Sequence, residues 1–400
     1  MRRTPTPQQK YPVLAGHHQA DVAIVGGGIT GALVAHAFAE ANVSVALIEG
    51  GLVGCGSTAA SSALLLQEPD LGLHELRQRY GTIASRRLWR LSQEAARKLI
   101  ALLQRLDIRC DLVPRDTIYY ARHGDGLEKL WREFELRTRD GFHGRWLSPG
   151  QLRDMTGIPG RGAILTRGGA QFDPYRACLG LLRAASGSGA RIFERTPVRR
   201  IDARRERVNL YTRDGVIDAR RVVIATGYAT PYFRPLAGRF RMFRTYVLAT
   251  ARMDASQRAE LGLSDVMVWD TDRPYHYARW SPDHRLVLGG ADRPVRTGQR
   301  RDQQFRMAIG ELRNYFETLL PALSAIETEA AWEGLFAMTP DSFPYIGPHR
   351  RYPRQWFALG YGGNGMTFGS LAARLLLDRW KDGRSRDHTL FAFDRLRRTP

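Results

Sequence analysis

A glycine turn near the start of the chain constrains the fold more than any other feature of the sequence. Residues 20–51 read ADVAIVGGGITGALVAHAFAEANVSVALIEGG. The apolar stretch Val22–Val25 predicts a strand, and the small residues of Ala32–Ala41 predict a helix. Val43–Ile48 predicts a second strand, which Glu49 follows. Glycines in a G-x-G-x-x-G spacing separate the first strand from the helix, and this order predicts a βαβ unit that binds a dinucleotide.

Each glycine of this motif is expected to have its own function. Gly26 makes the tight turn, Gly28 lets a pyrophosphate approach the backbone, and Gly31 lets the helix pack on the strand. The N-terminus of the helix offers free N–H donors and the positive end of the helix dipole. Glu49 is expected to bind the ribose hydroxyls. The same predicted site includes the neighbouring residues Ile29, Thr30 and Gly50.

The chain is strongly basic, but the distribution of its charge disfavours nucleic-acid binding. It has 400 residues and a formal net charge of +20, and only four of its 60 basic residues are lysines. The arginines are spread along the whole sequence, whereas a nucleic-acid-binding protein concentrates them on one face or segment. Anionic small molecules and membrane surfaces stay open as partners.

The cysteines and the apolar segments limit the remaining classes of protein. Cys55, Cys110 and Cys178 are far apart, which predicts neither a metal site nor a disulfide framework. The first 16 residues lack the apolar core of a secretory signal, and no segment offers about 18 consecutive apolar residues. We therefore expect no bound metal, no transmembrane segment and a cytoplasmic location.

A second G-x-G-x-x-G stands near the C-terminus, in the stretch FALGYGGNGMTFGS. It follows an apolar run and precedes a helical pattern, as a dinucleotide turn does. The candidate acid, Asp394, lies 29 residues after Gly365, and the chain ends six residues later. The sequence therefore has no room here for a second complete nucleotide unit. Without a site for NADH or NADPH, electrons have to come from the substrate itself.

Three segments resemble the D-amino-acid oxidase-like family of FAD-dependent oxidoreductases, which includes glycine oxidase and sarcosine oxidase. They are GGLVGCGSTAASSALLL (residues 50–66), GGAQFDPYRACLGLLRAASGSGARIFERTPV (168–198) and TPDSFPYIGPHRRYPRQWFALGYGGNGMTFGSLAARLLLDRW (339–380). The resemblance covers nearly the whole chain and is most specific in the terminal segments. It implies an α/β fold of glutathione-reductase-like architecture, in which a Rossmann-type FAD-binding domain carries an α+β substrate domain built on an antiparallel sheet.

The resemblance also implies how the cofactor is held. Val198 is implied to cover the adenine, and the Ala-Thr-Gly turn after Val222–Ala225 to pass the nucleotide half of FAD; taken singly, each fits plain sheet packing equally well. The second glycine turn is implied to wrap the flavin ring. The next helix then points its N-terminus at the N1–C2=O edge, where reduced flavin is negative. The further FAD residues are Gly56, Ser57, Thr58, Ser61, Val198, Ala225, Thr226, Gly227, Gly362, Gly363, Asn364, Gly365, Met366 and Thr367.

The activity that the resemblance implies is oxidation of a C–N bond in an amine or amino acid. A hydride passes from the carbon next to nitrogen to flavin N5, and the imine hydrolyses to a carbonyl compound and a free amine. Oxygen or another acceptor then takes the electrons. Two alternatives stay open. One is a flavin-dependent enzyme that acts on a modified RNA base, which the net charge motivates. The other is a quinone-linked dehydrogenase at the membrane surface.

The sequence departs from part of the family. Phe336 and Ala337 stand where amino-acid oxidases of this type often have an Arg-Pro that binds the substrate carboxylate. This difference counts against a glycine oxidase or a D-amino-acid oxidase. The same region has no flavin-tethering cysteine, and no histidine follows Ser57-Thr58, so we expect non-covalent FAD. Cys55 is interpreted as a small loop residue.

The domain organisation is predicted to be discontinuous. The FAD-binding domain is assembled from residues 15–80, 145–235 and 330–400. Residues 81–144 and 236–329 form the substrate domain, which would hold the substrate against the flavin ring.

Candidate substrate residues come from the strand-like stretch PYHYARW. Strand alternation places Tyr275, Tyr277 and Arg279 on one face and His276 on the other. Two phenols and a guanidinium would orient an amine and hold an acidic group, so we predict these three as the catalytic residues. A polar, solvated strand face is the competing interpretation. His276 is expected to be a structural histidine, and Tyr246 is a weaker candidate.

Overall fold

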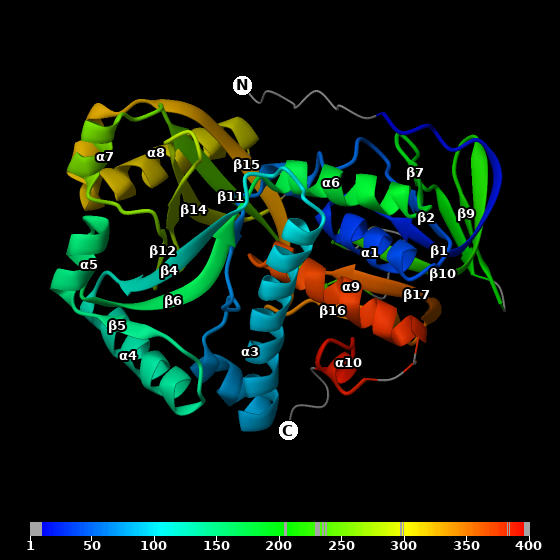
Figure 1. Cartoon of the computed structure of the whole chain (residues 1–400), viewed down its shortest axis with the longest axis horizontal. Helices are drawn as coiled ribbons and strands as arrows, with labels where there is room; N and C mark the ends of the chain where they lie inside the picture. Colours follow the sequence, from blue (N-terminus) through cyan, green and yellow to red (C-terminus); the bar gives the residue numbers. More distant parts are fainter. Residues whose placement is uncertain are drawn as a thin grey trace.

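Two β-sheets organise the chain in the computed structural model (Figure 1). One sheet has eight strands and the other has nine, and they lie side by side in this view with their helices around them. The structure describes residues 10–203, 206–228, 233, 236, 238–296, 298, 300–381, 383 and 385–395. The predicted α/β class with one largely parallel and one largely antiparallel sheet is confirmed.

The eight-stranded sheet has a parallel centre. Its strands are β1 (Gly16–Val25), β2 (Val45–Ile48), β7 (Arg191–Phe193), β8 (Arg200–Ala203), β9 (Val208–Tyr211), β10 (Gly215–Gly227), β16 (Tyr345–His349) and β17 (Tyr352–Leu359). The main order is β16-β17-β10-β1-β2-β7, and β1 pairs in parallel with β2 and β10. β2 is buried at all four positions, as expected for a short apolar strand inside a parallel sheet.

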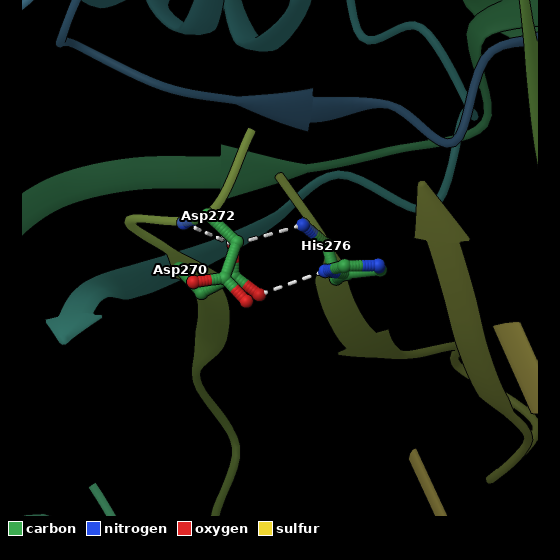
Figure 2. A group of neighbouring side chains, drawn as sticks. All are labelled: Asp270, Asp272 and His276. Carbon is green, nitrogen blue, oxygen red and sulfur yellow. Dashed lines mark hydrogen bonds and ion pairs between the residues drawn. The ribbon is translucent and has the colours of Figure 1, made fainter. Parts of the chain in front are cut away.

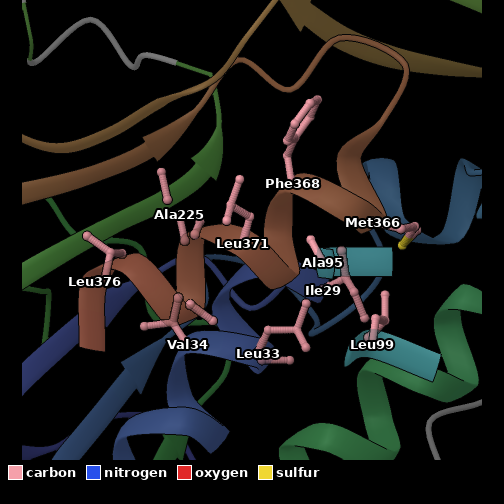
Figure 3. Close-up of a cluster of buried hydrophobic side chains, with 14 of the residues drawn as sticks. Ile29, Leu33, Val34, Ala95, Leu99, Ala225, Met366, Phe368, Leu371 and Leu376 are labelled. Atoms are coloured by element: carbon pink, nitrogen blue, oxygen red, sulfur yellow. The ribbon is translucent and has the colours of Figure 1, made fainter. Parts of the chain in front are cut away.

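Four helices pack beside this sheet. They are α1 (Ile29–Glu40), α3 (Leu73–Arg105), α6 (Pro174–Gly187) and α9 (Gly365–Lys381). Ten of the 12 residues of α1 are buried, because its small side chains let α6 and α9 pack closely against it. Figure 3 shows Leu33 and Val34 of α1 with Leu99 of α3 and Leu371 of α9 in one buried cluster. This packing fixes the positions of both glycine-led helices.

The nine-stranded sheet is antiparallel except where β12 pairs with β4. Its strands are β3 (Leu64–Leu65), β4 (Val113–Ala121), β5 (Arg145–Leu147), β6 (Gly162–Gln171), β11 (Arg241–Thr250), β12 (Met267–Asp270), β13 (Tyr277–Trp280), β14 (Leu286–Pro294) and β15 (Thr328–Met338). The order is β15-β11-β14-β13-β12-β4-β6-β3, with β5 on β6. The remaining helices are α2 (Ser57–Ala60), α4 (Gly124–Arg139), α5 (Pro149–Thr156), α7 (Ala255–Leu261), α8 (Arg301–Leu319), the 3-10 helix η2 (Pro321–Ala325) and α10 (Asp387–Leu390).

Two elements differ from what their local sequence suggests. Apolar residues at helical spacing predict a helix over Arg87–Leu106, but α3 begins earlier, at Leu73, and is kinked at Gly81, where φ is 73°. Glycine tolerates this left-handed conformation, so the two helical parts can join there. Leu390–Asp394 could be taken from the sequence for a strand, but it ends α10 and continues in turns. Phe391 is buried there, with its ring 6.1 Å from that of Phe343.

The domain boundaries remain a prediction. β3 and β6 come from ranges assigned to the FAD-binding domain, yet they pair within the nine-stranded sheet. α3 comes mainly from a range assigned to the substrate domain, yet it shares its core with α1 and α9. Each sheet, taken together with the helices packed on it, therefore contains residues from both predicted domains.

A buried ion pair fixes the C-terminal segment to the turn after β15. Arg395 donates from Nε and Nη2 to the two carboxylate oxygens of Asp341, at 2.7 and 2.8 Å. The Thr339 hydroxyl also donates to Asp341, at 2.9 Å. Asp341 thus shapes this turn through its own hydrogen bonds. A bidentate pair of this kind fixes orientation as well as distance.

The contact of α1 with the end of β1 makes a direct prediction. A Cβ on Gly31 would overlap the carbonyl oxygen of Gly26, whereas a Cβ on Gly310 in α8 would meet no heavy atom within 4 Å. Gly31→Ala should therefore lower the free energy of unfolding by about 3 kcal/mol or more. Gly310→Ala should raise it by about 0.4–1 kcal/mol. Urea denaturation of both variants measures the difference, and equal stabilities would contradict the close helix approach.

Candidate functional site

A cavity of about 430 Å³ lies between the two sheets. The end of β10, the loop after β1 and the N-terminus of α1 line one part of it. The turn before α9 and strands β11, β14 and β15 line the other part. Both glycine motifs therefore face the same space, although 336 residues separate Gly26 from Gly362.

The first glycine motif brings backbone amides to the cavity wall. Gly26 has a φ of 111°, and a Cβ on it would lie 2.6 Å from the carbonyl oxygen of Ala225. Only glycine fits this approach of β10 to the turn. The Ile29 amide donates to the Thr58 hydroxyl at 3.0 Å, which ties α1 to α2. No acidic residue occupies the first turn of α1, so its positive dipole end is left for an anion.

Glu49 connects this turn to the loop that follows β2. Its carboxylate accepts hydrogen bonds from the amides of Gly27 and Gly51, both at 2.7 Å. Glu49 also lines the cavity. A carboxylate has acceptor capacity beyond two hydrogen bonds, so this geometry leaves room for ribose hydroxyls.

The second glycine turn forms the opposite part of the cavity. Gly363 donates its amide to Asp70 at 2.7 Å, and the Asn364 side chain donates to the same carboxylate at 2.7 Å. A Cβ on Gly363 would overlap the Tyr275 hydroxyl, so this hydroxyl lies directly against the backbone of the turn. α9 begins at Gly365 with no acidic residue in its first turn. Its N-terminus thus faces the cavity with a positive dipole end.

Most of the predicted cofactor residues line this cavity. They are Gly26, Gly28, Ile29, Thr30, Glu49, Gly56, Ser57, Thr58, Ser61, Ala225, Thr226, Gly227, Gly362, Gly363, Asn364, Gly365 and Met366. Four others do not line it. Gly31 packs on Gly26, Thr367 donates its hydroxyl to the Leu66 carbonyl at 3.0 Å, Val198 packs against a core cluster, and Gly50 is exposed. For all the residues named in this paragraph, contact with a cofactor stays a prediction.

The three predicted catalytic residues are not brought together. Tyr275 and Tyr277 line the cavity, but Arg279 is not among the described residues that do. Arg279 donates from Nε to the Ser62 carbonyl at 2.6 Å and from Nη1 to the Trp280 carbonyl at 3.1 Å. Burial lowers the pKa of Arg279 to about 10. Strand alternation alone could not reveal that the loop at Ser62 takes up this guanidinium.

The phenols enter the cavity by different routes. Tyr277 starts β13 and lies against Gly289 of β14, where a Cβ would overlap its ring. Tyr275 stands before the strand, in the loop after the cis Arg273–Pro274 bond. Burial raises the pKa of both Tyr275 and Tyr277, so both are neutral hydrogen-bonding groups near pH 7.

A buried carboxylate fixes the loop that carries Tyr275. Asp270 accepts hydrogen bonds from the His276 side chain at 3.0 Å, from the His276 amide at 3.0 Å and from the Asp272 amide at 3.1 Å (Figure 2). The Tyr315 hydroxyl also donates to Asp270, and its ring stacks on His276 with centroids 3.6 Å apart. Hydrogen bonding and stacking thus hold the His276 ring outside the lining of the main cavity.

Two further carboxyl groups in the cavity were missed by sequence reasoning. Asp70 follows β3 and Asp292 lies on β14, and both line the cavity beside Tyr275 and Tyr277. Burial raises the pKa of each carboxyl to about 6. For Asp292 the Thr245 hydroxyl opposes this rise and the charge of Asp70 adds to it. No sequence motif marks either residue, since long-range strand pairing brings them here.

Tyr246 and Cys55, considered above, lie outside the lining. Tyr246 is fully buried, beside Phe305 with centroids 6.2 Å apart. Burial raises the pKa of the Cys55 thiol, which disfavours its reactive thiolate form. Neither residue is therefore in position to act on a ligand of the main cavity.

The described helices include none that is long and apolar enough to span a bilayer.

Comparisons with known proteins agree on one family. The family model for FAD dependent oxidoreductases matches residues 21–379. The chain is 27% identical over 384 residues to glycine oxidase of Bacillus subtilis (strain 168), covering 90% of this chain and 92% of the relative. It is 26% identical over 362 residues to gamma-glutamylputrescine oxidoreductase of Escherichia coli (strain K12), covering 90% and 83%.

Solved structures share the fold. Glycine oxidase from Geobacillus kaustophilus superposes with a TM-score of 0.79 at 24% identity, covering 92% of this chain and 96% of that chain. L-proline dehydrogenase from P. horikoshii superposes with a TM-score of 0.75 at 18% identity, covering 92% and 95%.

The position of Glu49 predicts its effect on cofactor retention. Glu49→Ala removes a charged acceptor from the cavity wall and frees the amides of Gly27 and Gly51. The dissociation constant of FAD should rise about 10- to 150-fold, as expected for a lost hydrogen bond to a charged group of about 1.5–3 kcal/mol. Equilibrium dialysis measures it. Glu40→Ala, which removes a surface partner of Arg105, is the matched control and should leave it unchanged. Equal effects of the two variants would refute this role.

The raised pKa of Asp292 predicts a pH-dependent stability. The folded-state pKa is about 6, above the ordinary value of 3.8, so ionisation of Asp292 destabilises the folded state as pH rises through about 6. Asp292→Asn should raise the free energy of unfolding at pH 7.5 by about 1–2 kcal/mol, after allowance for solvent screening. At pH 4.5, only a little above the ordinary pKa of 3.8, the gain should be about a third as large. Urea denaturation at both pH values measures this, and a loss of stability at pH 7.5 contradicts it.

Proposed function

We propose that this chain, which belongs to the family of FAD-dependent oxidoreductases, oxidises a C–N bond of an amine or amino acid by hydride transfer to the flavin. The curated relatives named above carry names that refer to an amino acid and to an N-acylated diamine. The observation that carries the proposal is the continuous cavity with a glycine-led helix N-terminus in each part.

The residues of the cavity fit FAD. The amides at the start of α1 and the glycines around Gly26 suit a pyrophosphate, which needs close backbone approach and N–H donors. Glu49 suits the ribose hydroxyls. The glycines of the second turn suit a flat ring, because a backbone without side chains can lie close to it.

The second glycine turn would also tune the ring. Bound FAD would supply the two-electron acceptor for oxidation of the C–N bond to an imine, which water would hydrolyse to a carbonyl compound and a free amine. The N-terminus of α9 would stabilise negative charge on a ring held at the second glycine turn. Asp70 fixes this turn through Gly363 and Asn364, so the donors are oriented before the reaction.

The remaining residues of the cavity position the substrate nitrogen. Hydride loss requires the reacting amine to be neutral, because its lone pair stabilises the cation that forms at carbon. The hydroxyls of Tyr275 and Tyr277 hydrogen-bond the amine without a formal charge. Trp269 packs edge-on against Tyr275 at 6.0 Å, and these aromatic rings keep the reacting atoms away from water.

The test is flavin reduction without oxygen. The purified protein should be yellow, should release FAD into solution on denaturation, and should lose its visible flavin absorption when amines or amino acids are added anaerobically. Hydroxy analogues such as glycolate against glycine are matched controls and should not reduce it. Oxygen and a quinone analogue are then added separately to identify the acceptor.

Two results would contradict separate parts of the proposal. Flavin that stays with the precipitated polypeptide contradicts the non-covalent attachment. Bound FAD that no amine or amino acid reduces contradicts the C–N oxidation.

A further inference from the structure

The cavity has the opposite charge from the rest of the protein. The sequence carries a net charge of +20, yet none of the described residues that line the cavity is Arg, Lys or His. Three lining residues are acidic: Glu49, Asp70 and Asp292. Glu49 lies at the first glycine turn, so Asp70 and Asp292 are the charged lining residues in the part of the cavity that holds Tyr275 and Tyr277. The acidic side chains of this part of the cavity favour a cationic ligand.

The nearby arginines either are held by other groups or lie outside the lining. Arg279 is engaged with the carbonyls of Ser62 and Trp280. Arg244 pairs with Glu333 at 2.5 Å. Arg273 lies in the loop before Tyr275, outside the lining, with its guanidinium 5.8 Å from the centroid of the Tyr275 ring, and its charge partly offsets that of Asp70.

The apolar residues of β15 complete this picture. Leu335, Phe336 and Ala337 line the cavity, so the stretch in which amino-acid oxidases of this type often have an Arg-Pro contributes no charged side chain here. Phe336 stacks on Phe243, with ring centroids 5.6 Å apart, and this contact holds the apolar Phe336 side chain in place at the cavity. A substrate carboxylate would lose its hydration here without gaining a cation, which is costly.

The two carboxyl groups have different partners. Asp70 accepts from the Gly363 amide and the Asn364 side chain, so it fixes the second glycine turn. Asp292 has one carboxylate oxygen, Oδ1, that is buried and accepts no hydrogen bond from the described residues. A buried oxygen without a partner is costly, and a ligand that donates to it removes this cost.

Aromatic rings surround the same space. Trp269 and Tyr275 lie 6.0 Å apart in an edge-on arrangement, and Tyr275 and Tyr277 lie 6.4 Å apart. Faces of such rings attract cations, and a nearby carboxylate adds to the attraction. A carboxylate with aromatic neighbours suits an ammonium group and repels a carboxylate group.

We propose that the substrate is a diamine without a carboxylate, whose second, protonated amino group is held by Asp292. This inference rests on the proposed function and adds the substrate class. A carboxylate paired with the reacting nitrogen would keep that nitrogen protonated and oppose hydride loss. A distal ammonium can pair with Asp292 throughout, and it also relieves the repulsion between Asp292 and Asp70.

A charge-matched pair of ligands tests this inference by binding alone. Benzamidine and benzoate have the same shape and opposite charge, and each is titrated into the FAD-loaded protein while the visible flavin spectrum is recorded. Benzamidine should bind at least about tenfold more tightly than benzoate, and Asp292→Asn should weaken its binding about 10- to 100-fold. Asp292→Glu should keep the preference. Asp283→Asn, in the exposed turn between β13 and β14, is the control and should change nothing.

Turnover separates this inference from the proposed function. Butane-1,4-diamine should be oxidised with a KM at least about tenfold below that of butylamine, and Asp292→Asn should raise the KM for the diamine at least about tenfold more than the KM for butylamine. Tighter binding of benzoate, or a preference for glycine or 4-aminobutanoate, would overturn the diamine class and leave amine oxidation standing. Failure of every amine and amino acid to reduce bound FAD would overturn the proposed function itself.

Discussion

The close approach of α1 to the end of β1 is the contact on which the site depends. Gly31 lies against the carbonyl of Gly26, and Gly26 in turn lies against the carbonyl of Ala225 at the end of β10. No side chain fits at either glycine, so the two strands and the helix meet at one point. The amides at the start of α1 therefore open directly into the cavity between the sheets.

The other part of the cavity depends on elements far away in sequence. β17 pairs with β10 in parallel, which places the turn before α9 beside the Ala-Thr-Gly turn. Asp70 then holds that turn through hydrogen bonds, and the hydrogen bonds accepted by Asp270 hold the loop that carries Tyr275. The cavity is thus bordered by two helix N-termini and by acidic and aromatic side chains. The protein as a whole nevertheless carries a high positive charge.

The parts that the sequence could predict are those encoded locally. The first glycine motif, Glu49 and the second glycine turn were predicted because their spacing and backbone requirements lie within short stretches of chain. Asp292 and Thr245 were missed because only the pairing of β11 with β14, which has a bulge between Arg244 and Tyr246, places them on the cavity. The position of the Arg279 guanidinium could not be predicted for the same reason, since it donates to the carbonyl of Ser62, 217 residues away in the sequence.

A crystal structure of the FAD-loaded protein tests the central claim most directly, namely that one FAD spans both helix N-termini. The account predicts the pyrophosphate within hydrogen-bond distance of the amides at Ile29 and Thr30, and the flavin ring against Gly363 and Met366 with one face open toward Tyr275 and Asp292. A flavin ring beside Glu49, or a cofactor bound outside this cavity, would contradict the account.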